Sequence, residues 1–346
     1  MSRLTIIGDG AWGTALGLHL HRAGHAVRIW GPFEEGIDDI QANRENRRFL
    51  PGIPVPPEIE WTSDPVSASA DAEMAVCAVP SQYYAGVVER FSAVLPRDCR
   101  MISVTKGLEP ETGNRLSQVA AHHLAPRSIA VLSGPSFALE VARGLPAAVV
   151  VAAGDPGVAA AAQALFSNDT FRVYTSDDVV GVELGGVCKN VIAIAAGAGD
   201  ALGFGTNARA ALITRGLAEM TRLAVALGAH PATLAGLSGL GDLVLTCTGP
   251  LSRNRKLGER IGNGERVPDI LADLKQVAEG AVNCAVIRDL ACDLAVETPI
   301  VDTVYRVLHE GMEPRRAVTE LMARDPKPER ETIQNRTISS SEETQP

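Results

Sequence analysis

Short apolar runs, each ending at a glycine or a polar turn, mark the first half of the chain. The first run covers residues 4–7 and ends at Gly8, and apolar side chains then recur at helical spacing over residues 14–22. Gly24 follows that predicted helix as a C-terminal glycine, and a second run covers residues 26–30. This order predicts a strand, a crossover helix and a second strand parallel to the first.

Further apolar runs lie at residues 74–79, 101–104, 129–132 and 147–153, and residues 171–174 are a candidate for one more strand. Runs that are apolar on both faces are typical of a parallel sheet that helices cover on each side. Each run leads into a turn or a polar cluster, which suits ligand binding at the carboxyl ends of strands. We therefore predict an α/β fold with an N-terminal Rossmann-type sheet that is doubly wound and mostly parallel.

Strand-like runs stop near residue 177, and helical stretches replace them. Helices are predicted over residues 179–197 and 207–227, the second closed by Gly228, and over parts of 253–261, 269–275, 281–294, 299–309 and 314–323. The predicted organisation is a nucleotide-binding domain over residues 1–180, an all-α substrate-binding domain over 181–325 and a tail over 326–346. The tail is polar and has little to bury, so we expect it to be disordered.

Composition then excludes several classes of protein. Of the 346 residues 46% are hydrophobic and the net charge is −9, which disfavours a globally basic nucleic-acid binder. The six cysteines form no CxxC pair and have no zinc-finger spacing, so we expect reduced thiols, no metal site and a cytoplasmic location. We find no signal segment at the N-terminus and no apolar run long enough to span a membrane.

The sequence Gly8-Asp9-Gly10-Ala11-Trp12-Gly13 has the spacing of a dinucleotide-binding turn. It follows a predicted strand and opens a predicted helix, which is the context that the motif requires. Gly8 allows a tight turn, Gly10 lets the backbone approach a pyrophosphate, and Gly13 lets helix pack on strand. The alternative is a cluster of packing glycines in another α/β fold. The predicted cofactor-binding residues of the turn are Gly8, Gly10, Ala11, Trp12 and Gly13.

The residues after the second strand bear on the choice between NAD and NADP. An acidic side chain there favours NAD and a basic one favours NADP. The chain has Trp30, Gly31, Pro32 and Phe33, followed by Glu34 and Glu35, and no lysine or arginine follows directly. One of these two glutamates would reach the ribose of the cofactor; the alternative is that both are solvated charges of a loop. The segment favours NAD and leaves NADP open.

Two lysines are candidates for chemistry. Lys106 follows the run 101–104. A cation at the end of a strand would hold a substrate anion or hydroxyl; the alternative is that Lys106 is an ordinary surface lysine. Lys189 is the only cation of the apolar stretch 179–197. It either extends to water or is buried, and burial would lower its pKa toward the operating pH. A buried Lys189 would then exchange a proton with a substrate oxygen.

Two polar segments of the second half likewise allow either a functional or a purely structural interpretation. Asp242 stands in the glycine-rich sequence 238–243, where it caps a helix, orients Lys189 or binds substrate. Residues 252–256, Ser-Arg-Asn-Arg-Lys, concentrate positive charge in an acidic chain. With Ser252 as a helix cap, nearby N–H groups and arginines would form a phosphate site, and the alternative is a solvated basic turn.

Taken together, these segments resemble the bacterial NAD(P)-dependent glycerol-3-phosphate dehydrogenases. The resemblance extends from Leu4 to about Ala323, and its most discriminating parts surround Lys189 and residues 252–255. The other matching segments are 8–16, 46–52, 79–82, 105–109, 132–140, 181–197, 200–205, 210–220, 239–248, 279–280 and 299–300.

The resemblance implies a Rossmann domain and a helical substrate domain, assembled as a homodimer. It implies reversible hydride transfer between NAD(P)H and dihydroxyacetone phosphate, which gives sn-glycerol 3-phosphate for phospholipid synthesis. Lys189 is then the proton donor to the ketone and the acceptor from the alcohol. The implied substrate contacts are Lys106, Gly134, Ser136, Lys189, Asp242, Ser252, Arg253 and Asn254. The further implied cofactor contacts are Trp12, Lys106, Ala138, Arg253, Val277 and Glu279.

The chain departs from the family pattern at three places. Pro32 stands where relatives often have a basic residue, Ala11 replaces a serine or other polar residue, and Asp200-Ala201 replaces Asp-Gly. None removes an implied catalytic group, but Pro32 argues against a preference for NADP. Two alternatives remain at this point. One is a dehydrogenase of the same architecture for another hydroxy or keto substrate, and the other is a non-catalytic NAD(H) sensor, which would not need Lys189.

Overall fold

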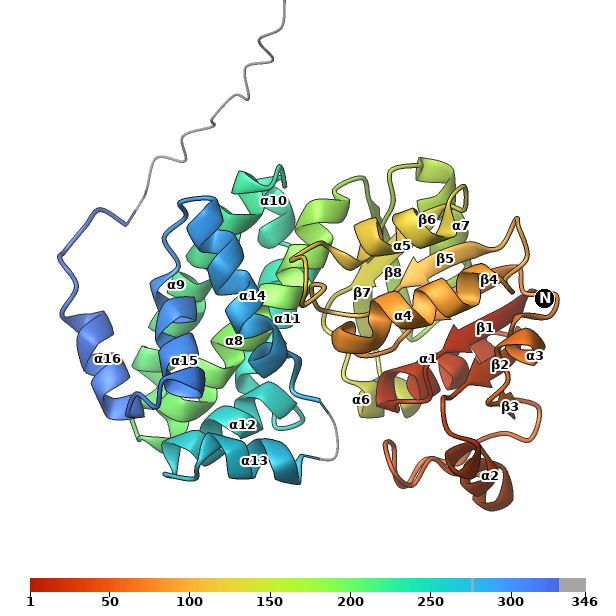
Figure 1. Cartoon of the computed structure of the whole chain (residues 1–346), viewed down its shortest axis with the longest axis horizontal. Coiled ribbons are helices and arrows are strands. Elements are labelled where there is room, and N and C mark those ends of the chain that lie inside the picture. The colour runs from red at the N-terminus through yellow and green to blue at the C-terminus, as the bar shows by residue number, and fades with distance from the viewer. Residues whose placement is uncertain (275–276, 330–346) are drawn as a thin grey trace, which may run out of the picture.

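One eight-stranded sheet occupies half of the molecule and a bundle of helices occupies the other half (Figure 1). The structure is a computed structural model that describes residues 1–274 and 277–329. The strands are β1 (Arg3–Ile7), β2 (Ala26–Trp30), β3 (Glu60–Thr62), β4 (Met74–Cys77), β5 (Arg100–Ser103), β6 (Ile129–Ser133), β7 (Ala147–Ala152) and β8 (Phe171–Ser176). Their order across the sheet is β3-β2-β1-β4-β5-β6-β7-β8.

All neighbouring strands are parallel except β6 and β7, so the prediction of a Rossmann-type, mostly parallel sheet is confirmed. The chain order reverses between β1 and β4, and the crevice at such a point is where doubly wound folds bind ligands. One expectation was wrong. Because β7 runs antiparallel to β6, the carboxyl end of the run 147–153 lies at the opposite edge from this crevice. The three-residue strand β3 was not predicted.

Alternate residues of the strands enter two different cores, which explains why the runs are apolar throughout. Ile6 packs on one face of the sheet with Leu16 and other apolar residues. Its neighbour Ile7 packs on the other face, with Tyr84 and Phe91. The helices of the sheet region are α1 (Ala11–Arg22), α2 (Glu34–Asn43), α3 (Pro65–Ser69), α4 (Ser81–Ser92), α5 (Leu116–Leu124), α6 (Ala138–Ala142) and α7 (Pro156–Phe166).

The second half is helical, as predicted. Its elements are α8 (Val179–Ala201), α9 (Gly205–Ala226), α10 (Pro231–Leu234), the π-helical turn η1 (Leu237–Gly241), α11 (Asp242–Thr248), α12 (Arg253–Gly262), α13 (Val267–Asp273), α14 (Glu279–Asp293), α15 (Pro299–His309) and α16 (Pro314–Met322). The short elements α10, η1 and α11 were not predicted. The predicted helix 269–275 corresponds to α13, although Lys275 lies outside the described residues, as does most of the predicted tail, from residue 330 onward.

Helix α8 is the central element of the helical half. It is long and apolar enough to cross a membrane, but 83% of its most apolar window is buried inside the fold, so it is a core helix. Glycines bring α12 against it: a Cβ on Gly197 would lie 1.9 Å from the Arg255 carbonyl oxygen, and one on Gly258 would lie 1.9 Å from that of Ile194. This backbone-to-backbone packing fixes the residues at the start of α12 relative to Lys189 on α8.

The same helix also joins the two halves. Near its start, Val182 packs against Val131, Val150 and Ala152 of β6 and β7. The predicted domain boundary at residue 180 therefore falls within the first turn of α8. All six cysteine thiols are unpaired and five of them are buried.

Candidate active site

The glycine turn lies at the crevice between β1 and β4. Gly8 has φ +122°, and a Cβ there would lie 2.9 Å from the Ala78 carbonyl oxygen. A Cβ on Gly13 would lie 1.9 Å from the carbonyl oxygen of Gly8. A Cβ on Gly10, in contrast, would meet nothing within 4 Å. Gly8 and Gly13 are therefore required for packing, whereas Gly10 leaves space that a ligand can enter.

The start of α1 fits the pyrophosphate of a dinucleotide. Gly10 is its N-cap, no side chain caps the helix, and its first turn contains no acidic residue. The N-terminal N–H groups and the helix dipole therefore favour an anion at Gly10. The indole Nε1 of Trp12 is buried and has no hydrogen-bond partner among the described residues, which is unusual for a buried donor. Ala11, Trp12 and Ala138 pack against the same hydrophobic core, since α6 lies beside α1.

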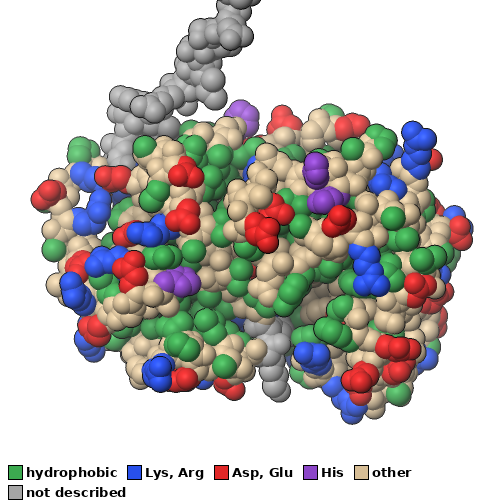
Figure 2. All heavy atoms as spheres, in the orientation of Figure 1, with side chains coloured by type: hydrophobic (Ala, Val, Ile, Leu, Met, Phe, Trp, Pro, Cys, Tyr) green, Lys and Arg blue, Asp and Glu red, His purple; other side chains and the backbone are tan. Residues whose placement is uncertain are grey.

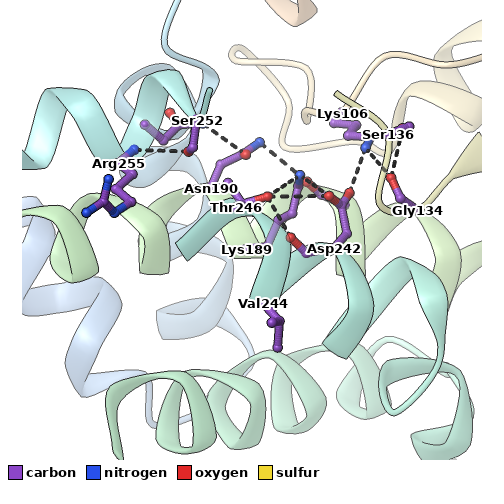
Figure 3. A network of polar contacts seen from close by, with 12 residues as sticks. Lys106, Gly134, Ser136, Lys189, Asn190, Asp242, Val244, Thr246, Ser252 and Arg255 are labelled. Atoms are coloured by element: carbon purple, nitrogen blue, oxygen red, sulfur yellow. Dashed lines mark hydrogen bonds and ion pairs between the residues drawn. The ribbon is translucent and has the colours of Figure 1, made fainter. Parts of the chain in front are cut away.

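A shared carboxylate is the centre of the second part of the site (Figure 3). Asp242, at the start of α11, binds Lys189 Nζ through Oδ1 and Lys106 Nζ through Oδ2, each at 2.6 Å. Lys106 also donates to the Gly134 carbonyl oxygen at 3.0 Å, and the Ser136 hydroxyl donates to the same oxygen at 2.9 Å. Five of the predicted substrate contacts therefore meet in one network.

Lys189 is buried rather than extended to water, with 7% of its side chain exposed. Burial lowers the pKa of Lys189 to about 8, an effect that Asp242 opposes and Lys106 reinforces. Burial alone would raise the pKa of Asp242, but the two ammonium groups outweigh it and hold that pKa below its usual value. At neutral pH the cluster thus contains an ionised carboxylate and a lysine that can release its proton near the operating pH.

Sequence reasoning missed Thr246, which completes this cluster. Its hydroxyl accepts a hydrogen bond from Lys189 Nζ at 2.8 Å and donates to the Asp242 carbonyl oxygen at 2.6 Å. Thr246 lies one turn after Asp242 on α11, so both side chains are presented on one face. The spacing of four residues was the available signal, but α11 itself was not predicted.

The start of α12 lies on the other side of Lys189 from Lys106, as Figure 3 shows for Ser252. Ser252 caps α12 by accepting a hydrogen bond from the Arg255 N–H at 3.2 Å, as predicted. Asn254 is buried; it donates to Asn190 Oδ1 and accepts from the Gly280 N–H, both at 2.9 Å. This chain of contacts connects α12 directly to the residue after Lys189.

The two arginines of the basic turn are placed differently. Arg255 is held by Asp200 at 2.8 Å and by Glu259 at 2.9 Å, so its charge is neutralised within the fold. Arg253 is accessible to solvent, yet desolvation by the surrounding protein lowers the pKa of its guanidinium, an effect that Glu279 opposes. Of these two, Arg253 is the more exposed arginine.

Glu279 links the helical half to the sheet region. Its carboxylate accepts from the Ser81 N–H at 3.1 Å and from the Ser81 hydroxyl at 2.6 Å, at the start of α4. Burial raises the pKa of Glu279, although Ser81 and Arg253 oppose the shift. Val277 is partly buried and adjoins residues 275–276, which lie outside the described residues. Figure 2 shows the surface hollowed between the two halves, on the side where α6 lies.

The end of β2 is remote from this network. Glu34 and Glu35 are exposed in the first turn of α2. A shallow open hollow there is lined by Pro32, Phe33, Glu34, Glu35, Gly36 and Arg48. The structure therefore groups the predicted residues in three places: the turn at Gly8–Gly13 with Ala138, the Asp242 network, and the start of α12 with Glu279. Among the described residues, no group of three or more His, Cys, Asp or Glu side chains is placed to hold a metal ion.

Comparison with known proteins gives a consistent result over both halves. The family model for the N-terminus of NAD-dependent glycerol-3-phosphate dehydrogenase matches residues 3–159, and the model for its C-terminus matches residues 178–319. A glycerol-3-phosphate dehydrogenase (NAD(P)+) from Geobacter sulfurreducens is 49% identical over 331 residues, covering 95% of this chain and 99% of the relative. One from Anaeromyxobacter dehalogenans is 49% identical over 330 residues, covering 94% and 99%. The crystal structure of glycerol-3-phosphate dehydrogenase from Coxiella burnetii has a TM-score of 0.91 at 40% identity and covers 93% of this chain and 99% of that one.

Proposed function

The chain belongs to the NAD-dependent glycerol-3-phosphate dehydrogenase family, and from this premise we propose which of its residues perform the reaction. It is an NAD(P)-dependent oxidoreductase that interconverts dihydroxyacetone phosphate and sn-glycerol 3-phosphate. The observation that carries the assignment of roles is the buried Lys189, bound to Asp242 at 2.6 Å. We assign Lys189 as the general acid and base.

The nicotinamide of the bound cofactor supplies or accepts the hydride. In ketone reduction, charge develops on the substrate oxygen, and the Lys189 ammonium stabilises that charge and donates a proton. In alcohol oxidation, the neutral amine accepts the hydroxyl proton. A pKa of about 8 for Lys189 suits both directions, since each form is populated near neutral pH.

Asp242 positions the two lysines relative to each other. Its carboxylate binds each ammonium group, so it limits the rotation of both side chains and reduces their mutual repulsion. Lys106 brings a second positive charge to the site, which favours a developing oxyanion. Two of the three ammonium protons of Lys189 bind Asp242 and Thr246, which fixes the direction of the third. We assign Gly134 and Ser136 to the substrate contact on this side.

Arg253 is assigned to the substrate phosphate. It is accessible, it starts α12, and Asn254 beside it is held rigidly against α8 through Asn190. A phosphate bound there, away from the reacting carbon, supplies binding energy and orients the ketone. Ser252 supports this placement as the cap of α12.

The glycine turn and α1 would hold the pyrophosphate of the cofactor, with Trp12, Ala138, Val277 and Glu279 as further contacts. The cofactor is NAD or NADP. We propose a cofactor domain over residues 1–180, a substrate domain over 181–325 and a homodimer in the cytoplasm. The product would feed glycerophospholipid synthesis.

The decisive experiment is steady-state reduction of dihydroxyacetone phosphate with NADH and with NADPH. We expect turnover with at least one of the two, and strong preference for dihydroxyacetone phosphate over dihydroxyacetone and over ketones without a phosphate. Turnover of another ketone, with none of dihydroxyacetone phosphate, would mean that the substrate assignment is wrong. Cofactor binding with no turnover of any ketone would instead favour a sensor.

A further inference from the structure

Asp9 stands between Gly8 and Gly10 in the glycine turn and has no role in the mechanism above. Asp9 is the second residue after the end of β1, and Gly31 is the first residue after the end of β2. The two strands are parallel neighbours, with Ile7 opposite Trp30, so Asp9 and Gly31 lie at the same carboxyl edge. A Cβ on Gly31 would lie 2.7 Å from both Cγ and Oδ2 of Asp9. The Asp9 carboxyl group thus fills the space that a side chain at position 31 would need.

The main chain of Asp9 is fixed, whereas its carboxylate has unused acceptor capacity. The Asp9 carbonyl oxygen accepts from Asn46 Nδ2 at 2.7 Å and from the Thr14 hydroxyl at 3.2 Å. Burial raises the pKa of Asp9, and two contacts oppose that shift: a hydrogen bond to its own main-chain N–H and the positive charge of Arg48. Within residues 1–274 and 277–329, no hydrogen bond joins this carboxylate to another side chain. The carboxylate therefore has acceptor capacity left for further donors at a ligand-binding edge.

In doubly wound folds, the acid that binds the ribose hydroxyls of the adenosine half normally comes from the end of β2. Here that position offers Gly31, Pro32 and Phe33, none of which has a polar side chain. The carboxylate at this place comes from the neighbouring strand instead. It accepts hydrogen bonds from hydroxyl groups and repels a phosphate at the same position.

We propose that Asp9 makes this enzyme select NAD(H) over NADP(H), by accepting hydrogen bonds from the adenosine ribose and opposing a 2′-phosphate. The proposal rests on the proposed function in that the dinucleotide occupies the glycine turn. Arg48 lines the adjacent hollow and attracts a 2′-phosphate, and the Asp9 charge offsets that attraction. Loss of the Asp9 charge therefore leaves Arg48 unopposed.

The test is equilibrium binding of NADH and NADPH to the full chain without substrate, followed by nicotinamide fluorescence and by calorimetry. We expect the wild type to bind NADH at least about tenfold more tightly than NADPH. Asp9→Asn keeps the size of the side chain and removes its charge, and we expect it to lower this ratio by about tenfold or more. Asp38→Asn, the same change at an exposed site on α2, is the matched control and should leave the ratio unchanged.

Equal or tighter binding of NADPH by the wild type would overturn the proposal, as would an unchanged ratio in Asp9→Asn. An equal shift in Glu35→Gln would also overturn it, because general charge at the hollow would then explain the preference. If Asp9→Asn shows no cooperative thermal transition, Asp9→Ser carries the same expectation. Because the binding measurement contains no substrate, a negative result for Asp9 does not contradict the proposed reduction of dihydroxyacetone phosphate. Conversely, selective NADH binding without turnover of dihydroxyacetone phosphate would contradict the proposed function and leave the role of Asp9 supported.

Discussion

Lys106 and Lys189 bind opposite oxygens of the same carboxylate, that of Asp242, each at 2.6 Å. Lys106 follows β5 in the sheet region, whereas Lys189 lies in the middle of α8 in the helical half. The carboxylate is 1% exposed, so these charges interact with little screening. The site therefore depends on how the two halves meet, and it couples the protonation of one lysine to the charge of the other.

Lys189→Ala should retain cofactor binding and lose about 10²- to 10⁴-fold in kcat, the usual contribution of a positioned acid or base. The glycine turn that would hold the cofactor does not contact Lys189 in the network described above, so NADH binding serves as the control. Lys189→Arg keeps the positive charge but does not release its proton in this pH range, and it should be equally slow. A kcat near that of the wild type in either variant would rule out the proton-transfer role.

The pH dependence should be opposite in the two directions. Ketone reduction needs protonated Lys189, so kcat/KM should fall as pH rises through about 8, the pKa of Lys189. Alcohol oxidation needs the neutral amine, so kcat/KM should rise through the same pH and then level off. Initial rates measured from pH 6 to pH 10 in both directions check this. If kcat/KM rose with pH in both directions, or fell in both, a group other than Lys189 would control the rate.

Asp242→Asn should move that inflection to lower pH. Burial and Lys106 lower the pKa of Lys189, and the Asp242 carboxylate raises it, so loss of the negative charge leaves the two lowering effects without this opposition. The pH profile of ketone reduction distinguishes this from simple structural damage, which would lower kcat at all pH values alike. An inflection that stays near the wild-type value would mean that Asp242 has no electrostatic effect on Lys189.

The sheet was predictable because its strands are buried on both faces and therefore read as continuous apolar runs. Lys189 and Asp242 were identified for a similar reason, since a charge in an apolar or glycine-rich stretch contradicts its surroundings. Their contact was one of the alternatives open for Asp242, but the sequence did not select it, because 53 residues separate the two and the packing of α11 on α8 brings them together. Helix α11 was missed because its seven residues are too short for a periodic pattern. The NAD or NADP question stayed open because the three residues directly after β2, Gly31, Pro32 and Phe33, have no charged side chain.

Arg253→Ala should raise the KM for dihydroxyacetone phosphate by roughly 10- to 100-fold, the range expected for a hydrogen-bonded charge pair. The KM for dihydroxyacetone, which has no phosphate, should change little. Lys256→Ala removes an exposed cation from the same helix and is the matched control for a general loss of positive charge. An unaltered KM in Arg253→Ala, or an equal rise in Lys256→Ala, would show that no specific phosphate contact is made at Arg253.

Glu219 predicts a pH-dependent stability that is separate from catalysis. Glu219 lies on α9 and is 3% exposed. Its carboxyl group accepts hydrogen bonds from two N–H groups at the start of α15, that of Ile300 at 2.8 Å and that of Val301 at 3.3 Å. Burial raises the pKa of Glu219 to about 7, so the folded state binds its proton more tightly than the unfolded chain does. The contribution of Glu219 to the free energy of unfolding is therefore fully present below the ordinary glutamate pKa and is lost as pH rises through about 7.

Relative to Glu219→Gln, the free energy of unfolding of the wild type should fall between pH 5 and pH 7.5, by at most about 1.4 kcal/mol per pH unit. Urea unfolding of both chains across this range measures the difference, with Glu310→Gln at the other end of α15 as the control. A difference that is constant with pH would show that the fold does not shift the ionisation of Glu219.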